Sequence, residues 1–238
     1  MQRYFASLDN NKVILSKDDE HHVLHVMRNR VGDCLEVVAS SKLYLCLVKA
    51  VNPLEIEVLK EIDNQTKSKD ITLFFALAKG EKIDFVIQKA TELGAKNIVL
   101  ISLKRCVVKL DSDDFKKKLV RYNKIAKEAA EQCHRLDITN ILGIYSLNNL
   151  PKELLEGNKY IAYEKEAGST ANFFDELSSL DVDTPISVAI GPEGGFEEVE
   201  VEKFNELGFK NVSLGNRILR TETAAVYALS VISFMLER

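Results

Sequence analysis

The pattern of hydrophobic and polar positions changes character near residue 70. Before that point, short runs rich in β-branched and other apolar residues are separated by turn residues, which predicts β-strands. The expected strands are Val13–Leu15, Leu35–Val38, Leu43–Val48 and Leu54–Val58. Between the first two, Asp18–Arg28 has apolar residues at helical spacing, and Asp18 or Asp19 is the expected helix cap. The first third of the chain therefore predicts a small β-barrel or sandwich with one helix packed on it.

After this point, short apolar runs alternate with stretches of helical periodicity. Such alternation predicts an α/β fold with a mostly parallel sheet covered by helices. The expected strands are Ile71–Ala78, Asn97–Ile101, Ile141–Tyr145, Lys159–Tyr163, Ile186–Ile190 and Asn211–Leu214. The expected helices are Ile83–Leu93, Asp113–Gln132, Glu197–Leu207 and Ala224–Leu236, with shorter pieces at 150–155 and 173–180. The last helix is apolar almost all round, which predicts burial under the sheet or in a subunit interface.

The polar stretch Asn64–Asp70 lacks periodicity and is the best candidate for a linker. We therefore place a domain boundary there and expect two domains, residues 1–68 and residues 71–238. A chain of 238 residues has room for both.

Composition narrows the class of protein. Hydrophobic residues at 46% and charged residues at 29% are ordinary for a globular protein, and a net charge of −4 means that nucleic-acid binding would need a local basic patch. The four cysteines include no C-x-x-C pair, which favours a reducing cytoplasm over disulfides or zinc. Met1–Phe5 lacks a signal-peptide core, and no apolar run is long enough to span a membrane. We expect a cytoplasmic protein without a membrane segment.

A metal site is not expected either. His21 and His25 have the spacing of two metal ligands on one helix, but no third ligand lies nearby in the sequence. An ordinary solvated helix face is the favoured interpretation.

The stretch Ala189–Phe196 is the first of two candidate ligand loops. Its glycines Gly191, Gly194 and Gly195 let a ligand approach the backbone closely, and the N–H groups of the following helix start can bind polar atoms. The residue order differs from both the dinucleotide-binding fingerprint and the P-loop. Glu193 would repel phosphate but tolerates a cation, a ribose or an amine. A glycine-rich turn without a ligand is the alternative.

The second candidate loop is Leu214–Ala224. A helix cap accounts for its threonines and for Glu222, but not for Arg217 and Arg220, which the helix dipole disfavours at this end. Arginines in this place favour an anionic partner. Because ligands bind at the carboxyl ends of strands in open α/β sheets, we expect the two loops to form one pocket.

Together, the two loops resemble the paired signature of the RsmE-type 16S ribosomal RNA (uracil-N3)-methyltransferases of the SPOUT superfamily. The resemblance covers essentially the whole chain. It also includes Arg3–Phe5, His22–Arg28, Lys79–Lys82, Gln88–Gly94, Arg105–Lys109 and Glu131–Cys133.

The resemblance implies a SPOUT-type domain with a mostly parallel sheet and a C-terminal trefoil knot, preceded by a small PUA-like RNA-binding β-barrel. The knot follows from the resemblance alone, because knots are rare exceptions to the usual topology rules. S-adenosylmethionine is the implied methyl donor, and a homodimer is the implied assembly. The implied substrate is N3 of a uridine in the decoding region of 16S rRNA, within the 30S subunit.

The family pattern also implies site residues. The expected cofactor-binding residues are Ile190, Gly191, Glu193, Gly194, Gly195, Leu214, Gly215, Ile218, Leu219 and Thr223. The expected RNA-binding residues are Arg3, Arg28, Lys79, Lys82, Lys89, Arg105 and Arg135. Since N3 of uracil carries a proton, catalysis needs positioning, proton removal and stabilisation of the developing anion. Arg220 or Arg217 is expected to meet the uracil oxygens or the flanking phosphate. Glu222 and Glu193 are candidate bases that the sequence does not rank.

Two other functions stay open at this stage. The same scaffold could methylate a different acceptor, a ribose 2′-hydroxyl or a guanine nitrogen. It could also be a non-catalytic ribosome-assembly or RNA-binding protein that kept the pocket. A nucleotide-dependent enzyme of another type is disfavoured because the phosphate-loop glycine pattern is missing.

Overall fold

The computed structural model describes residues 1–63, 69–110, 112–163, 173–178 and 183–236. Contacts divide the chain into two compact units. Unit 1 comprises Met1–Lys67 and Ala130–Asp137, and unit 2 comprises Ser68–Ala129 and Ile138–Arg238. Most of the expected linker, residues 64–68, lies outside the described residues.

Unit 1 is built on a six-stranded sheet with the order β1-β4-β5-β6-β3-β2. Its strands are β1 (Arg3–Phe5), β2 (Ser7–Asp9), β3 (Lys12–Ile14), β4 (Cys34–Ala39), β5 (Lys42–Val51) and β6 (Leu54–Ile62). All neighbours are antiparallel except β1 and β4. Tyr4, Leu35, Val37, Cys46 and Val48 form much of its core. The sequence did not predict β1 and β2, because neither Arg3–Phe5 nor Ser7–Asp9 contains the run of β-branched apolar residues that indicated β3.

The helix of unit 1 is α1 (Lys17–His21), which continues as a π-helical turn, η1 (His22–Val26). The expected caps, Asp18 and Asp19, are wrong: the cap is Ser16, whose Oγ accepts a hydrogen bond from the backbone N–H of Asp19 at 3.2 Å. Serine is a strong cap in its own right, and the aspartates instead occupy the first turn, where the helix dipole favours negative charge.

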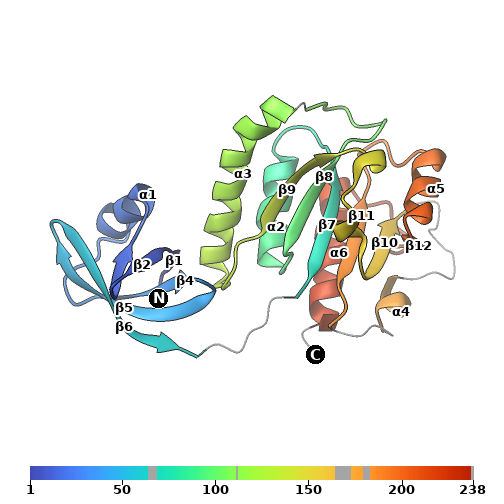
Figure 1. Cartoon of the computed structure of the whole chain (residues 1–238). Helices are drawn as coiled ribbons and strands as arrows, with labels where there is room; N and C mark the ends of the chain where they lie inside the picture. Colours follow the sequence, from blue (N-terminus) through green and yellow to red (C-terminus); the bar gives the residue numbers. More distant parts are fainter. Residues whose placement is uncertain (64–68, 111, 164–172, 179–182, 237–238) are drawn as a thin grey trace. The chain divides into compact units, whose positions relative to one another are not determined.

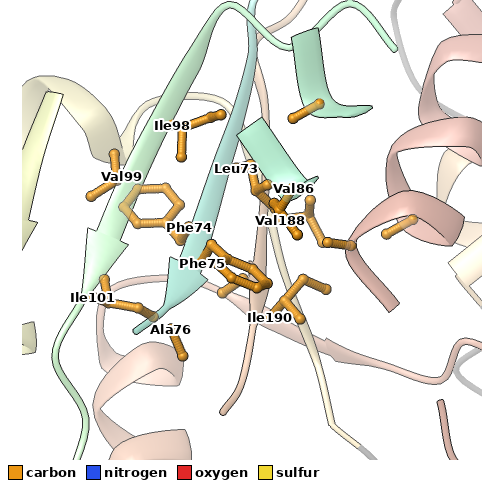
Figure 2. Close-up of a cluster of buried hydrophobic side chains, with 14 of the residues drawn as sticks. Leu73, Phe74, Phe75, Ala76, Val86, Ile98, Val99, Ile101, Val188 and Ile190 are labelled. Atoms are coloured by element: carbon orange, nitrogen blue, oxygen red, sulfur yellow. The ribbon is translucent and has the colours of Figure 1, made fainter. Parts of the chain in front are cut away.

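Unit 2 contains a six-stranded sheet with the order β12-β10-β11-β7-β8-β9 (Figure 1). Its strands are β7 (Ile71–Ala76), β8 (Asn97–Ile101), β9 (Asn140–Tyr145), β10 (Asn158–Ala162), β11 (Ile186–Ile190) and β12 (Lys210–Val212). Every pair is parallel, which confirms the predicted mostly parallel sheet. Figure 2 shows the apolar side chains that β7, β8 and β11 bury, among them Phe74, Phe75, Val99 and Val188.

The strand order places a switch point between β7 and β11. From β7 the chain proceeds outward to β8 and β9, and then crosses to the other side of β7 for β10, β11 and β12. The loops that follow β7 and β11 therefore leave the sheet in opposite directions at adjacent carboxyl ends. Such a point is where open parallel sheets bind ligands.

The helices of unit 2 connect these strands. They are α2 (Lys82–Glu92), α3 (Ser112–Gln132), α4 (Phe173–Ser178), α5 (Glu198–Glu206) and α6 (Thr221–Leu236), with 3-10 turns η2 (Leu147–Asn149) and η3 (Lys152–Leu155). Residues 179–180 of one expected helical piece lie outside the described residues. Gly94, with φ of 85°, follows the end of α2, as its sequence position predicted.

Helices α2 and α6 pack against each other, and α6 also packs against β11 (Figure 1). This places the first residues of α2 and α6 near the carboxyl end of β11. Helix α6 buries Ala225, Ala228 and Ile232 but leaves Tyr227 and Phe234 exposed. Among the described residues, no helix is both long enough and apolar enough to cross a membrane.

Candidate functional site

A cavity of about 580 Å³ opens at the carboxyl ends of β10, β11 and β12 and at the start of the helix that follows β7. This volume falls within the roughly 300 to 1,000 Å³ of small-molecule sites. Its walls consist of Lys82, Ala162, Tyr163, Ile190, Gly191, Pro192, Glu193, Gly194, Gly195, Phe196, Ser213, Leu214, Gly215, Arg217, Ile218, Leu219, Arg220, Thr221 and Ala224. Both candidate loops therefore line one pocket, as predicted.

The expected cofactor residues all line this cavity except Thr223. Arg217 and Arg220 line it as well, whereas Glu222 does not. Ala162 and Tyr163 also line the cavity although neither was predicted to do so, and Lys82, expected among the RNA-binding residues, lies in the cavity wall. Their positions in the sequence could have indicated this, because they lie at or after the carboxyl ends of parallel strands, and these ends share one edge of the sheet.

The backbone of the first loop, Gly191–Phe196, is closely packed. A Cβ atom added at Gly191 would lie 2.8 Å from Cε2 of Phe196, whose ring is buried. A Cβ atom added at Gly194 would lie 3.1 Å from Cβ of Arg105. Glycine is needed at Gly191 because no larger residue fits without moving that ring.

Side chains from distant segments tie this loop in place. Nη1 of Arg105 donates a hydrogen bond to the carbonyl oxygen of Gly194 at 2.9 Å. Oγ1 of Thr221, at the start of α6, donates one to the carbonyl oxygen of Gly191 at 2.5 Å. Thr221 is buried, so this bond joins the second loop to the first inside the protein.

The part of the second loop before Thr221, Leu214–Arg220, is far more open. Gly215 has φ of 110° with open space around it, a conformation that disfavours other residues. Ile218 is 88% exposed, which is unusual for a large apolar side chain. Arg217 and Arg220 are exposed on either side of it. The second loop therefore presents two cations and one apolar side chain at the edge of the cavity.

Lys82, the first residue of α2, lies between two carboxylates. Its Nζ atom is 3.0 Å from Oε1 of Glu193 and 3.3 Å from Oε2 of Glu222. Burial raises the pKa of Glu193, but hydrogen bonds from its own backbone N–H, from the Lys82 ammonium and from the backbone of Lys79 outweigh this effect, so its pKa lies below the ordinary value. The hydrogen bond to Glu193 raises the pKa of Lys82 more than burial lowers it. Lys82 and Glu193 are therefore both charged at neutral pH.

The other expected RNA-binding residues of unit 2 lie outside the cavity walls. Arg105 is exposed and braces the first loop through Gly194. Lys79 is exposed in the turn after β7. Lys89, on α2, pairs with Glu92 at 2.8 Å.

In unit 1, Arg3 is only 5% exposed. It pairs with Glu36 at 2.8 Å and donates a hydrogen bond to the carbonyl oxygen of His134. Arg135 pairs with Asp137 at 3.0 Å. Arg28 is exposed, with φ of 55°. Arg3 thus ties β1 to the segment that follows α3, whereas Arg28 presents its charge to solvent.

Across the described residues, no group of three or more His, Cys, Asp or Glu side chains has the arrangement of a metal site. The His21 and His25 rings lie with centroids 4.7 Å apart.

Comparison with known proteins shows which family the chain belongs to. The family model for the RNA methyltransferase domain matches residues 65–233. The ribosomal RNA small subunit methyltransferase E of Bacillus subtilis is 36% identical over an alignment that covers 100% of this chain and 98% of that protein. The protein of the same name from Mesomycoplasma hyopneumoniae is 34% identical, with 97% and 98% covered.

Solved structures show the same fold over nearly the whole chain. The crystal structure of a ribosomal RNA small subunit methyltransferase E from Neisseria gonorrhoeae, bound to S-adenosyl methionine, matches with a TM-score of 0.83 at 28% identity, covering 98% of this chain and 97% of that one. A putative methyltransferase from Legionella pneumophila, in complex with the same cofactor, matches with a TM-score of 0.83 at 29% identity, covering 98% and 96%. The chain therefore belongs to the RNA methyltransferase family, and within it to the ribosomal RNA small subunit methyltransferases E.

Proposed function

We propose that this protein transfers a methyl group from S-adenosylmethionine to N3 of a uridine in the decoding region of 16S rRNA. The observation that carries the proposal is the shared cavity: a glycine-rich backbone forms one wall, and Arg217 and Arg220 lie on the opposite loop. Such a site combines a small-molecule pocket with an edge suited to an anionic polymer. Membership of the family supplies the reaction class.

The cavity has the chemistry to hold this donor. Its glycines allow close backbone contact with an uncharged nucleoside end, and neither loop has the phosphate-binding glycine pattern. Lys82 and Glu193 of its wall form an ion cluster with Glu222, and this cluster of one ammonium and two carboxylates suits a donor whose reacting end is a sulfonium. When bound, S-adenosylmethionine supplies a methyl group that is already activated for transfer.

The protein must then position uracil and help N3 lose its proton. Arg217 and Arg220 lie at the cavity, where they would contact the uracil oxygens or the phosphate next to it. Glu193 lines the cavity and Glu222 does not, which favours Glu193 as the carboxylate nearest the base.

RNA contact outside the cavity is assigned to the exposed residues Arg28, Lys79 and Arg105, with Lys89 as a further candidate. Phosphate contacts of this kind position the RNA without reading its sequence. We assign Arg3 to holding unit 1 together, because its guanidinium is buried against Glu36. The PUA-like character of unit 1 and the trefoil knot in unit 2 are proposed from the family resemblance.

A homodimer is proposed from the surface of α6. Tyr227 and Phe234, seven residues apart on this helix, are 42% and 64% exposed. Residues at this spacing lie on the same side of a helix, so they form an apolar strip that a second copy would cover. Light scattering would give the mass of the assembly in solution.

Methyl transfer to purified 30S subunits, compared with naked 16S rRNA and followed by digestion to nucleosides, tests the proposed function. We expect 3-methyluridine as the methylated product. A methylated ribose or guanine would instead assign a different acceptor.

Calorimetry with S-adenosylmethionine separates the non-catalytic alternative from these outcomes. A protein that does not bind the donor, and leaves both RNAs unmethylated, would be an RNA-binding or assembly protein rather than an enzyme.

A further inference from the structure

Lys82 lies in the cavity wall and joins three segments of unit 2 through charge. It begins α2, Glu193 belongs to the loop after β11, and Glu222 lies in the first turn of α6. Ion pairs near the surface stabilise a fold only weakly, so the two carboxylates around Lys82 matter chiefly for where they hold its ammonium group.

The two glutamates stand in different places around this lysine. Glu193 lines the cavity together with Lys82, whereas Glu222 does not. Oε2 of Glu222 is buried, and Nζ of Lys82 lies 3.3 Å away, which is close enough for an ion pair. Lys82 therefore has Glu222 as a counter-ion outside the cavity walls and itself lines the cavity.

The charge of this cluster argues against phosphate as the partner of Lys82. One ammonium and two carboxylates sum to −1, so a phosphate brought to Lys82 would also approach Glu193 and Glu222. A neutral base meets no such repulsion. Its carbonyl oxygens accept hydrogen bonds, and an ammonium group has three N–H donors to offer.

We propose that Lys82 is the cation that donates a hydrogen bond to a carbonyl oxygen of the target uracil and stabilises the negative charge that develops there during methyl transfer. This inference rests on the proposed function and deepens it, because it names a catalytic residue for that reaction. It also separates the two glutamates: Glu193 accepts the proton, and Glu222 positions Lys82.

Proton removal from N3 and methyl transfer both take place beside Lys82. The N3–H bond of uracil breaks, and its proton forms an O–H bond with the Glu193 carboxylate. The N3 electron pair forms the new bond to the methyl carbon, while the sulfur–methyl bond breaks and leaves its electrons on sulfur. Negative charge thus moves from Glu193 to the uracil oxygens, and Lys82 lies beside both. The ammonium group compensates the charge before and after the proton moves, while Glu222 holds it in place.

The decisive experiment compares uridine with 5-fluorouridine at the target position of reconstituted small subunits. Fluorine at C5 withdraws electrons and makes N3–H more acidic, so the fluorinated base depends less on Lys82. For Lys82→Met we expect single-turnover transfer to uridine to fall by about 10²- to 10³-fold, the usual effect of removing one anion-stabilising donor. The ratio of the fluorouridine rate to the uridine rate should be at least about tenfold higher in the variant than in the wild type.

Lys96→Met is the matched control. Lys96 also pairs with a carboxylate, Asp70, at 2.8 Å in unit 2, but it is absent from the cavity walls. This variant should keep the wild-type rate and the wild-type ratio. The ratio is measured within each protein, so partial loss of folded Lys82→Met protein would not change it.

A double-mutant cycle tests the role of Glu222. If Glu222 acts only by positioning Lys82, the Lys82→Met/Glu222→Gln protein should be no slower than Lys82→Met alone. A further loss of tenfold or more would make Glu222 a base in its own right.

The inference is overturned if Lys82→Met methylates uridine within about threefold of the wild-type rate, or if its fluorouridine ratio equals that of the wild type. Failure of the proposed function would show differently, because wild-type protein would then yield no 3-methyluridine.

Discussion

The two loops that line the cavity are held in opposite ways. Four side chains or rings hold the first: Arg105 bonds Gly194, Thr221 bonds Gly191, Lys82 pairs with Glu193, and Phe196 packs under Gly191. In the second loop, by contrast, the side chains of Arg217, Ile218 and Arg220 are exposed at the edge of the cavity.

This difference suggests that the two loops have different functions. A binding site for a small molecule gains affinity when its backbone is fixed beforehand, because less freedom is lost on binding. A loop that meets a large RNA instead needs exposed cations. We infer that the first loop fixes the methyl donor, whereas the second loop completes the donor pocket and presents Arg217 and Arg220 to the RNA.

Gly191→Ala should give the largest effect on the first loop. Its Cβ atom would meet the Phe196 ring at 2.8 Å and force the buried ring to move. We expect the free energy of unfolding to fall by about 1 to 3 kcal/mol and donor affinity to fall by about tenfold. Chemical denaturation and calorimetry measure the two. An unchanged donor affinity would mean that the loop is not the donor site.

Thr221→Val tests the bond between the loops with a smaller change. The valine keeps the shape of threonine but cannot donate to the Gly191 carbonyl oxygen. The free energy of unfolding should fall by about 1 kcal/mol, and donor affinity should fall with it. Thr221→Ser keeps the hydroxyl and is the matched control. Equal effects of valine and serine would point to packing instead.

Lowering the pH should weaken the ion pair between Glu193 and Lys82 and so lower the free energy of unfolding. Its pKa is lower in the folded protein than its ordinary value of 4.5, so the carboxylate stabilises the fold above that pH. This contribution is lost as the pH falls through the folded pKa. The stability difference between wild type and Glu193→Gln should therefore shrink on acidification, as followed by urea denaturation at several pH values. A difference that grows on acidification would contradict the ion pair with Lys82.

Ile218→Ser should have the smallest effect on the fold. At 88% exposure, the side chain contributes little burial, so the free energy of unfolding should stay within about 0.5 kcal/mol. A marked loss of stability would show that this loop is held as firmly as the first.

The sequence predicted the sheet of unit 2 well because its central strands β7, β8 and β11 are almost entirely buried apolar runs, and β11 has the expected bounds. It also predicted the shared pocket, since strand ends in a parallel sheet lie at one edge. It could not predict the partners of Lys82, because Glu193 is 111 residues away along the chain. The partners of Arg3 are also distant along the chain, at Glu36 and at the carbonyl oxygen of His134. The sequence alone therefore placed Arg3 among the expected RNA-binding residues.

The most direct test of the division between the loops is the Arg217→Ala/Arg220→Ala protein, measured for donor affinity and for single-turnover methyl transfer to 30S subunits. Each arginine is expected to make charged hydrogen bonds worth about 1.5 to 3 kcal/mol to the RNA. We expect donor affinity within about threefold of the wild type and transfer slower by a hundredfold or more. Normal methylation, or a loss of donor affinity that matches the loss of rate, would contradict it.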